Sequence, residues 1–171
     1  MNINNNLYLI TDTKIGIVDF RNILKESMTM KKLGKEFLQF EKRLNEKIKK
    51  QEKILRDKEY KLSSNKTKIS NERYNQEKNN LNKEITNLQK FAFAEKKELN
   101  LSFQLIQKKL SDVLATIIKN ISKDKNIDYV LLKENIFLIN NSDIDLTNEA
   151  LKKFDEKTSN LKIQFVKKKG K

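Results

Sequence analysis

The sequence contains no histidine, cysteine, tryptophan or proline, and it has only three glycines. Without histidine or cysteine, the chain lacks thiolate nucleophiles, soft metal ligands and the most common general base at neutral pH. No Asp or Glu lies in the apolar, glycine-bounded setting of a tuned carboxylate pair. We therefore expect no enzyme, no cofactor and no metal site, and helices that continue without proline breaks.

Long apolar runs are also missing. No segment approaches the roughly 18 apolar residues that a membrane-spanning helix needs. Residues 1–14 contain one short apolar run, Leu7–Ile10, without the basic and apolar regions of a secretory signal. We expect either a cytoplasmic protein or a mature form from which a signal has been removed.

The charge balance is strongly basic, with 37 Lys and Arg against 23 Asp and Glu and a net charge of +14. A basic chain attracts nucleic acid, anionic lipid or acidic protein segments. Only four of the basic residues are Arg, which is the residue preferred for reading base edges. We therefore expect no specific nucleic-acid partner.

The composition places strand-like ends around a long helical middle. Residues 14–20 predict a strand, and residues 127–140 predict two strands joined by a turn at Lys133–Asn135, with Asn135 as a left-handed residue. Thr147 is a candidate N-cap of a C-terminal helix, and residues 161–166 could form a short strand. The expected parts are an N-terminal segment (1–13), a β body with a helix (14–20 and 126–156), a helical arm (21–125) and a basic tail (157–171).

In the arm, apolar residues recur every three or four positions from Leu33 to Leu62 and again from Leu81 to Ile121. The pattern is interrupted by the helix-poor residues Ser63–Asn65, which place the tip of a hairpin near residues 63–70. Two long helices joined in this way should pack antiparallel as a coiled coil. The predicted fold class is α+β, a small β body with a long helical hairpin.

The predicted body is small, about 45 residues when the possible strand at 161–166 is included, and a core of that size is marginal alone. Since the chain has neither disulfides nor zinc ligands to reinforce it, association between copies is the remaining source of stability. The body is therefore predicted to be an oligomerisation unit. The expected interface residues are its apolar strand residues, namely Ile15, Ile17, Val18, Phe20, Val130, Leu132 and Phe137.

The arm carries a candidate binding surface. Between Lys47 and Arg73 there are ten basic and four acidic residues, a net charge of +6. The basic candidates are Lys47, Lys49, Lys50, Lys53, Arg56, Lys61, Lys66 and Lys68. The apolar candidates are Tyr60, Tyr74, Phe91 and Phe93. Because Phe91 and Phe93 are two positions apart, only one of them can face the partner helix. A solvated helix face, or packing against another subunit, would explain the same residues without a binding role.

Two segments resemble a known family. IGIVDFRNILKES (15–27) and IDYVLLKENIFLINNSDIDLTNEALKKF (127–154), with the charged hairpin between them, are similar to the Skp/OmpH family of periplasmic chaperones. The resemblance implies a jellyfish-like homotrimer whose arms enclose a cavity, where unfolded outer-membrane proteins are held without ATP. It also implies a periplasmic location. The tail beyond Glu156 extends past the usual end of the family.

Some members of that family have a proposed lipopolysaccharide-binding patch. Its residues do not match here, so contact with anionic lipid or lipopolysaccharide rests on the resemblance alone. The main alternative function is a structural or nucleic-acid-associated basic coiled coil, and a membrane-surface helix comes third. The strand, turn and strand pattern of residues 127–140 argues against the main alternative.

Overall fold

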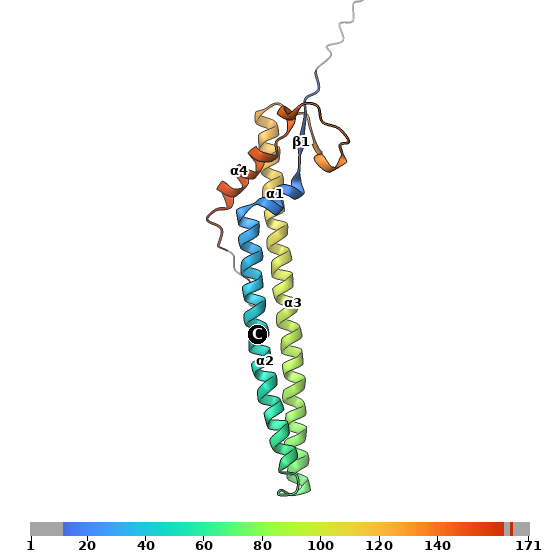
Figure 1. The fold of residues 1–171 in the computed structure, drawn as a ribbon, viewed down its shortest axis with the longest axis vertical. Helices are drawn as coiled ribbons and strands as arrows, with labels where there is room; N and C mark the ends of the chain where they lie inside the picture. The colour runs from blue at the N-terminus through green and yellow to red at the C-terminus, as the bar shows by residue number, and fades with distance from the viewer. Residues whose placement is uncertain (1–11, 163–164, 166–171) are drawn as a thin grey trace, which may run out of the picture. The chain divides into compact units, whose positions relative to one another are not determined.

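A computed structural model describes residues 12–162 and 165 and divides the chain into two compact units (Figure 1). The described part of unit 1 comprises residues 12–31 and 109–161, and that of unit 2 comprises residues 32–108, 162 and 165. The α+β class expected from the sequence is confirmed. The domain boundaries expected from the sequence stay predictions.

Unit 1 is built around a two-stranded parallel sheet. Strand β1 (Ile15–Val18) pairs with β2 (Tyr129–Leu132), and Ile15 lies opposite Tyr129. Parallel pairing needs a crossover connection, and here the crossover includes the whole helical arm. Gly16 lies in close packing, because a Cβ there would lie 3.0 Å from the Leu146 side chain, which would have to shift to make room.

The first strand is shorter than expected. Residues 14–20 were predicted as a strand, but β1 ends at Val18 and helix α1 (Phe20–Glu26) begins at Phe20. The reason is a local cap, since the Asp19 carboxylate accepts a hydrogen bond from the Asn22 backbone N–H at 2.8 Å. Phe20 is therefore a helical residue, which corrects its placement in a strand.

The second of the two strands predicted within residues 127–140 does not form. After β2 the chain forms a short 3-10 turn, η1 (Lys133–Asn135), and residues 136–140 pair with no strand in the described part of the chain. Phe137 in this segment is fully exposed. The predicted position of the left-handed residue is also wrong. Asn126 (φ 53°) adopts that conformation, and Asn135 does not.

Asn126 lies just beyond the C-terminal end of α3 (Asn71–Asp124). The Ile127 N–H donates to the Ser122 carbonyl at 2.8 Å, and the Asn126 N–H donates to the Lys123 carbonyl at 3.2 Å. These two bonds form a Schellman motif, which places a left-handed residue at position 126. The chain turns there from α3 into β2.

A second 3-10 turn, η2 (Ser142–Ile144), precedes α4 (Thr147–Thr158). Thr147 is the first residue of α4 and does not cap it, which corrects the sequence prediction. Its hydroxyl instead accepts a hydrogen bond from the Asp19 N–H at 2.9 Å, 128 positions away along the chain. Phe154 of α4 is completely buried, and α4 packs against α1.

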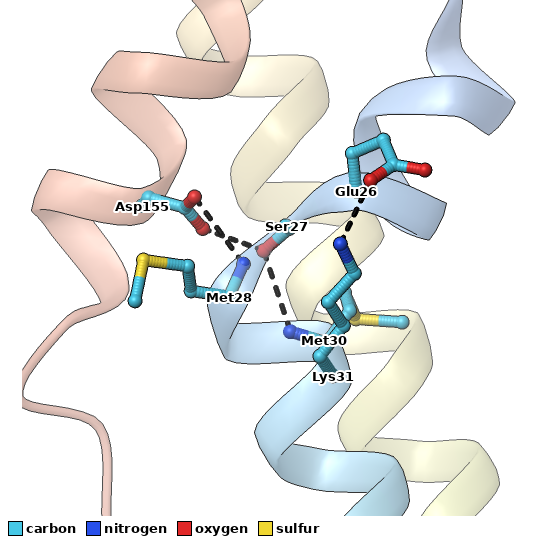
Figure 2. Close-up of polar contacts among 6 residues, drawn as sticks. All are labelled: Glu26, Ser27, Met28, Met30, Lys31 and Asp155. Atoms are coloured by element: carbon cyan, nitrogen blue, oxygen red, sulfur yellow. Dashed lines mark hydrogen bonds and ion pairs between the residues drawn. The ribbon is translucent and has the colours of Figure 1, made fainter.

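Asp155 of α4 caps the start of α2 (Met28–Ser64), as Figure 2 shows. Its carboxylate accepts hydrogen bonds from the Ser27 hydroxyl at 2.6 Å and from the Met28 N–H at 3.2 Å. One turn further along α4 from Asp155, the Thr158 hydroxyl lies 2.7 Å from the Thr29 hydroxyl of α2, and both are buried. Because Thr158 donates to the Phe154 carbonyl, Thr29 is the donor of this pair. The C-terminal helix is therefore bonded to the first turn of α2.

Unit 2 contains most of α2 and α3, which run antiparallel and side by side (Figure 1). Phe37 contacts Phe103 with ring centroids 4.4 Å apart, and Lys58 forms a 2.6 Å ion pair with Glu84. The predicted stripes supply the buried residues Leu33, Ile48, Leu62 and Leu81. Among the described residues, no helix has an apolar stretch that would cross a membrane.

The short strand predicted for residues 161–166 lies partly outside the described residues. Leu161 and Lys162, which are described, are not in a strand.

Candidate functional site

The basic candidates form an exposed surface on unit 2. All eight predicted residues, from Lys47 to Lys68, are exposed on α2 or in the turn that follows it. Within residues 12–162 and 165, none of the eight forms an ion pair with a carboxylate. Two of them cover aromatic rings, since Lys47 lies 4.8 Å from the Phe91 centroid and Lys66 lies 5.6 Å from that of Tyr74. Their charges are therefore available to an acidic partner.

The apolar candidates separate into covered and exposed residues. Phe93 is 71% exposed and Tyr60 is 75% exposed, whereas Phe91 and Tyr74 are half-buried. The spacing argument predicted that one of Phe91 and Phe93 faces away from the partner helix, and that residue is Phe93. Phe91 lies against α2 beneath Lys47.

Three exposed leucines on the arm were missed by the sequence reasoning. Leu38 of α2 and Leu101 and Leu105 of α3 are 62%, 44% and 60% exposed. Each lies outside the stripe of positions that faces the partner helix, and this offset was the signal that could have identified them. Together with Tyr60 and Phe93, they place scattered apolar side chains on an otherwise basic arm.

An aromatic cluster lies on the part of unit 2 that is far from the hairpin tip in sequence. Phe37, Phe40 and Phe103 belong to the predicted stripes and are half-buried. Phe165, from the C-terminal tail, contacts this cluster with its ring centroid 5.0 Å from Phe40 and 6.1 Å from Phe37, both edge-on. The Arg43 guanidinium lies 4.5 Å from the centroid of Phe40. Helical periodicity does not predict contact with a tail.

The predicted interface residues of unit 1 do not share one environment. Ile17 and Val18 are 1% and 2% exposed and belong to the core of their own chain. Phe20 and Val130 are half-buried, while Ile15, Leu132 and Phe137 are exposed. Three further exposed apolar residues lie on or just after β2, namely Tyr129, Leu131 and Leu138.

Strand β2 also has a free edge. It pairs with β1 on one side, and β1 bridges to Asp145 on its other side, so β2 is the outer strand among the described residues. An exposed edge strand with apolar side chains is a template for pairing with another chain. The exposed residues on and after β2 therefore form the candidate assembly surface of unit 1.

The Asp145 carboxylate lies between the turn after β2 and the start of α4. It pairs with Lys133 and accepts a hydrogen bond from the Thr147 N–H. Burial disfavours its ionised form, but hydrogen bonds from Lys133 and Thr147 and the Lys133 charge outweigh burial and lower the pKa of Asp145. Lys133 Nζ lies 2.7 Å from the carboxylate, and the same contact raises the pKa of Lys133. The next residue, Leu146, donates its N–H to the Ile17 carbonyl at 2.8 Å.

Acid should loosen this connection. A carboxyl group with a lowered folded pKa contributes stability above its unfolded pKa of about 3.9, and that stability is lost as the pH falls through the folded pKa. Hydrogen exchange at the Leu146 amide should therefore report an easier opening at pH 3 than at pH 6. Asp145→Asn should cost up to about 1 kcal/mol at pH 6 and remove most of this pH dependence. An equal dependence in both proteins would assign it to other carboxylates.

Comparison with known proteins gives two matches and one absence. A family model described as outer membrane protein (OmpH-like) matches residues 14–154. A crystal structure of a candidate outer membrane chaperone (OmpH-like) from Caulobacter crescentus CB15 has a TM-score of 0.80 and 17% sequence identity, and the match covers 89% of each chain. No curated protein matches. At that identity the structural likeness shows the fold.

Proposed function

Since the chain belongs to the OmpH-like family of outer membrane proteins, we propose that it is a holdase chaperone that works without ATP. Its clients would be unfolded outer-membrane proteins in the periplasm, which it would keep from aggregating. The observation that carries this proposal is the arm surface of unit 2, where eight basic side chains that form no ion pair with the described carboxylates accompany exposed apolar residues such as Phe93 and Tyr60.

The two kinds of side chain would act at different stages. Exposed positive charges attract an acidic unfolded chain over a Debye length of about 8–10 Å and so raise the encounter rate. Scattered apolar side chains then contact apolar segments of the client without imposing one conformation. A client held in this way stays unfolded and can be released without an energy source.

Assembly would complete the holdase. We propose that unit 1 associates into a homotrimer through the free edge of β2 and the exposed apolar residues around it, of which Tyr129, Leu132 and Phe137 are examples. Several arms around one client multiply weak contacts, because the second and third contacts form within one complex. An isolated arm would hold the same client more weakly.

The direct test follows aggregation of an unfolded, acidic β-barrel outer-membrane protein after dilution from urea, with no nucleotide present. The protein should suppress light scattering at near-stoichiometric amounts. Replacing Lys47, Lys49, Lys50, Lys53 and Lys61 with Gln should slow client association about tenfold at low salt and weaken its salt dependence.

The matched control replaces the same five lysines with Arg, which keeps the charge and should keep the rate. Stopped-flow fluorescence of a labelled client at two salt concentrations separates association from dissociation. A Gln variant that changed only the dissociation rate would contradict electrostatic capture. Unchanged aggregation in the presence of the wild-type protein would overturn the holdase function.

A further inference from the structure

The C-terminal tail provides an aromatic residue to the arm. Phe165 packs edge-on against Phe40 and Phe37, at interplanar angles of 62° and 61°, in the arrangement that aromatic pairs prefer. Phe37 in turn contacts Phe103 of α3, so the ring of Phe165 lies on a surface formed by both helices of unit 2. The cluster formed by Phe37, Phe40 and Phe103 will be called the aromatic platform.

The tail lies outside the part of the chain that the family match covers. That match ends at residue 154, and α4 ends at Thr158, seven positions before Phe165. In sequence, residues 161–165 alternate apolar and polar side chains, as an extended peptide with one apolar face does. Phe165, the residue that contacts the platform, therefore belongs to a segment with the sequence pattern of such a peptide.

We propose that the aromatic platform is a binding site for extended polypeptide segments with an aromatic anchor, and that Phe165 occupies it until an unfolded client displaces it. This proposal rests on the holdase function and adds a site and a competitor to it. An occupant tethered to the same chain has an effective concentration in the millimolar range, so even a weak contact keeps the site covered.

Charge makes the tail a replaceable occupant. Residues 161–171 contain five lysines and no acidic residue, and the two arm segments around the platform, residues 32–47 and 95–109, each have a net charge of +2. Like charges repel, so the tail is held by its tether and its aromatic contact against an unfavourable field. An acidic client has the opposite charge, so the same field attracts it.

A tryptophan probe can report occupancy directly, because the chain contains no tryptophan. In Phe165→Trp, emission should be shifted to shorter wavelength than in urea, since the indole contacts the platform. Adding Phe40→Leu removes one ring but keeps an apolar side chain at that position, and should shift the emission to longer wavelength. Phe93→Trp, at a position that is 71% exposed, is the control for a solvated indole on the arm.

Displacement is then measured in Phe165→Trp with an unfolded β-barrel outer-membrane protein whose tryptophans are replaced by Phe. The indole emission should shift to longer wavelength at the client concentrations at which labelled client binds by anisotropy. Phe165→Ser should tighten client binding about threefold to tenfold, because the site no longer has an internal competitor. A synthetic peptide of residues 159–166, added at millimolar concentration, should displace the indole of Phe165→Trp as well.

The outcomes separate this proposal from the holdase function. If the indole emission of Phe165→Trp is the same with and without Phe40→Leu, or if client binds without shifting it, the self-occupied site is wrong while the holdase function stands. If no client binds but Phe40→Leu and the free peptide both shift the emission, the peptide site stands and the holdase function fails. A peptide that leaves the indole emission unchanged would overturn the site itself.

Discussion

Phe154→Ala should lower the unfolding free energy of unit 1 by about 3–5 kcal/mol, the range for removing a buried aromatic ring. The Phe154 side chain is completely buried on α4, and the described part of unit 1 is small, with a two-stranded sheet, short helices and the last turns of α3 around it. A loss of that size is comparable to the whole stability of a small domain. We expect unit 1 to be largely unfolded at 37 °C.

Circular dichroism and hydrogen exchange would separate the two units in this variant. Amides of β1 and β2 should lose protection, while most of the helical signal from α2 and α3 should remain, because their packing in unit 2 does not involve residue 154. Phe93→Ala is the matched control, since that ring is 71% exposed and its removal should change stability by less than about 0.5 kcal/mol. Equal protection of β1 in wild type and Phe154→Ala would contradict this account of the core.

Leu132→Asp should dissociate the proposed trimer while leaving each subunit folded. Leu132 is 41% exposed in the single chain, so a carboxylate there is tolerated by the subunit. In an interface, the same carboxylate would be buried without a partner, at a cost of several kcal/mol. We expect association to weaken by at least a hundredfold, and sedimentation to change from the mass of a trimer to that of a monomer.

Two controls define the meaning of that result. Leu101→Asp changes a residue of similar exposure, 44%, on the arm and should leave the oligomer intact. Val18→Asp should unfold unit 1 itself, because Val18 is 2% exposed within its own chain, and so cannot test the interface. A folded Leu132→Asp variant with the mass of the wild type would place the assembly surface elsewhere.

The sequence predicted elements that depend on local pattern. The stripes from Leu33 to Leu62 and from Leu81 to Ile121 are a property of helical periodicity, and the helices follow them. The turn at Lys133–Asn135 likewise forms where the sequence placed it. Exposure of the arm lysines follows from the same pattern, because residues outside an apolar stripe face water.

Two failures have local causes, since the Asp19 cap ends β1 early and the Schellman motif at the end of α3 makes Asn126 the left-handed residue. Others involve partners that are distant in sequence. Residues 136–140 have strand-like composition but pair with no strand among the described residues, because strand propensity depends on packing against neighbouring strands as well as on composition. The Thr147 hydroxyl bonds to Asp19 rather than to its own helix, and no local rule identifies that partner. For the same reason, contact between Phe165 and the aromatic platform was not predicted from periodicity.

The wide separation of β1 and β2 has a consequence for the order of folding. Contacts within the arm join residues that are closer in sequence than Ile15 and Tyr129, and contacts between nearby residues form faster. Within unit 2, the antiparallel helices also bring the chain back toward the start of the arm, since Phe103 of α3 contacts Phe37 of α2. The chain entropy that must be given up to bring β1 and β2 together is therefore largely given up when the arm forms, before the sheet pairs.

Unit 1 closes last in this order. Strand β1 lacks its partner until Tyr129–Leu132 has emerged, and the Asp155 cap on α2 needs a further 23 residues beyond Leu132. A growing chain therefore carries a formed arm while its strand β1 is still unpaired. The free edge of β2, through which copies would associate, becomes available only after the whole arm and Leu132 have been made.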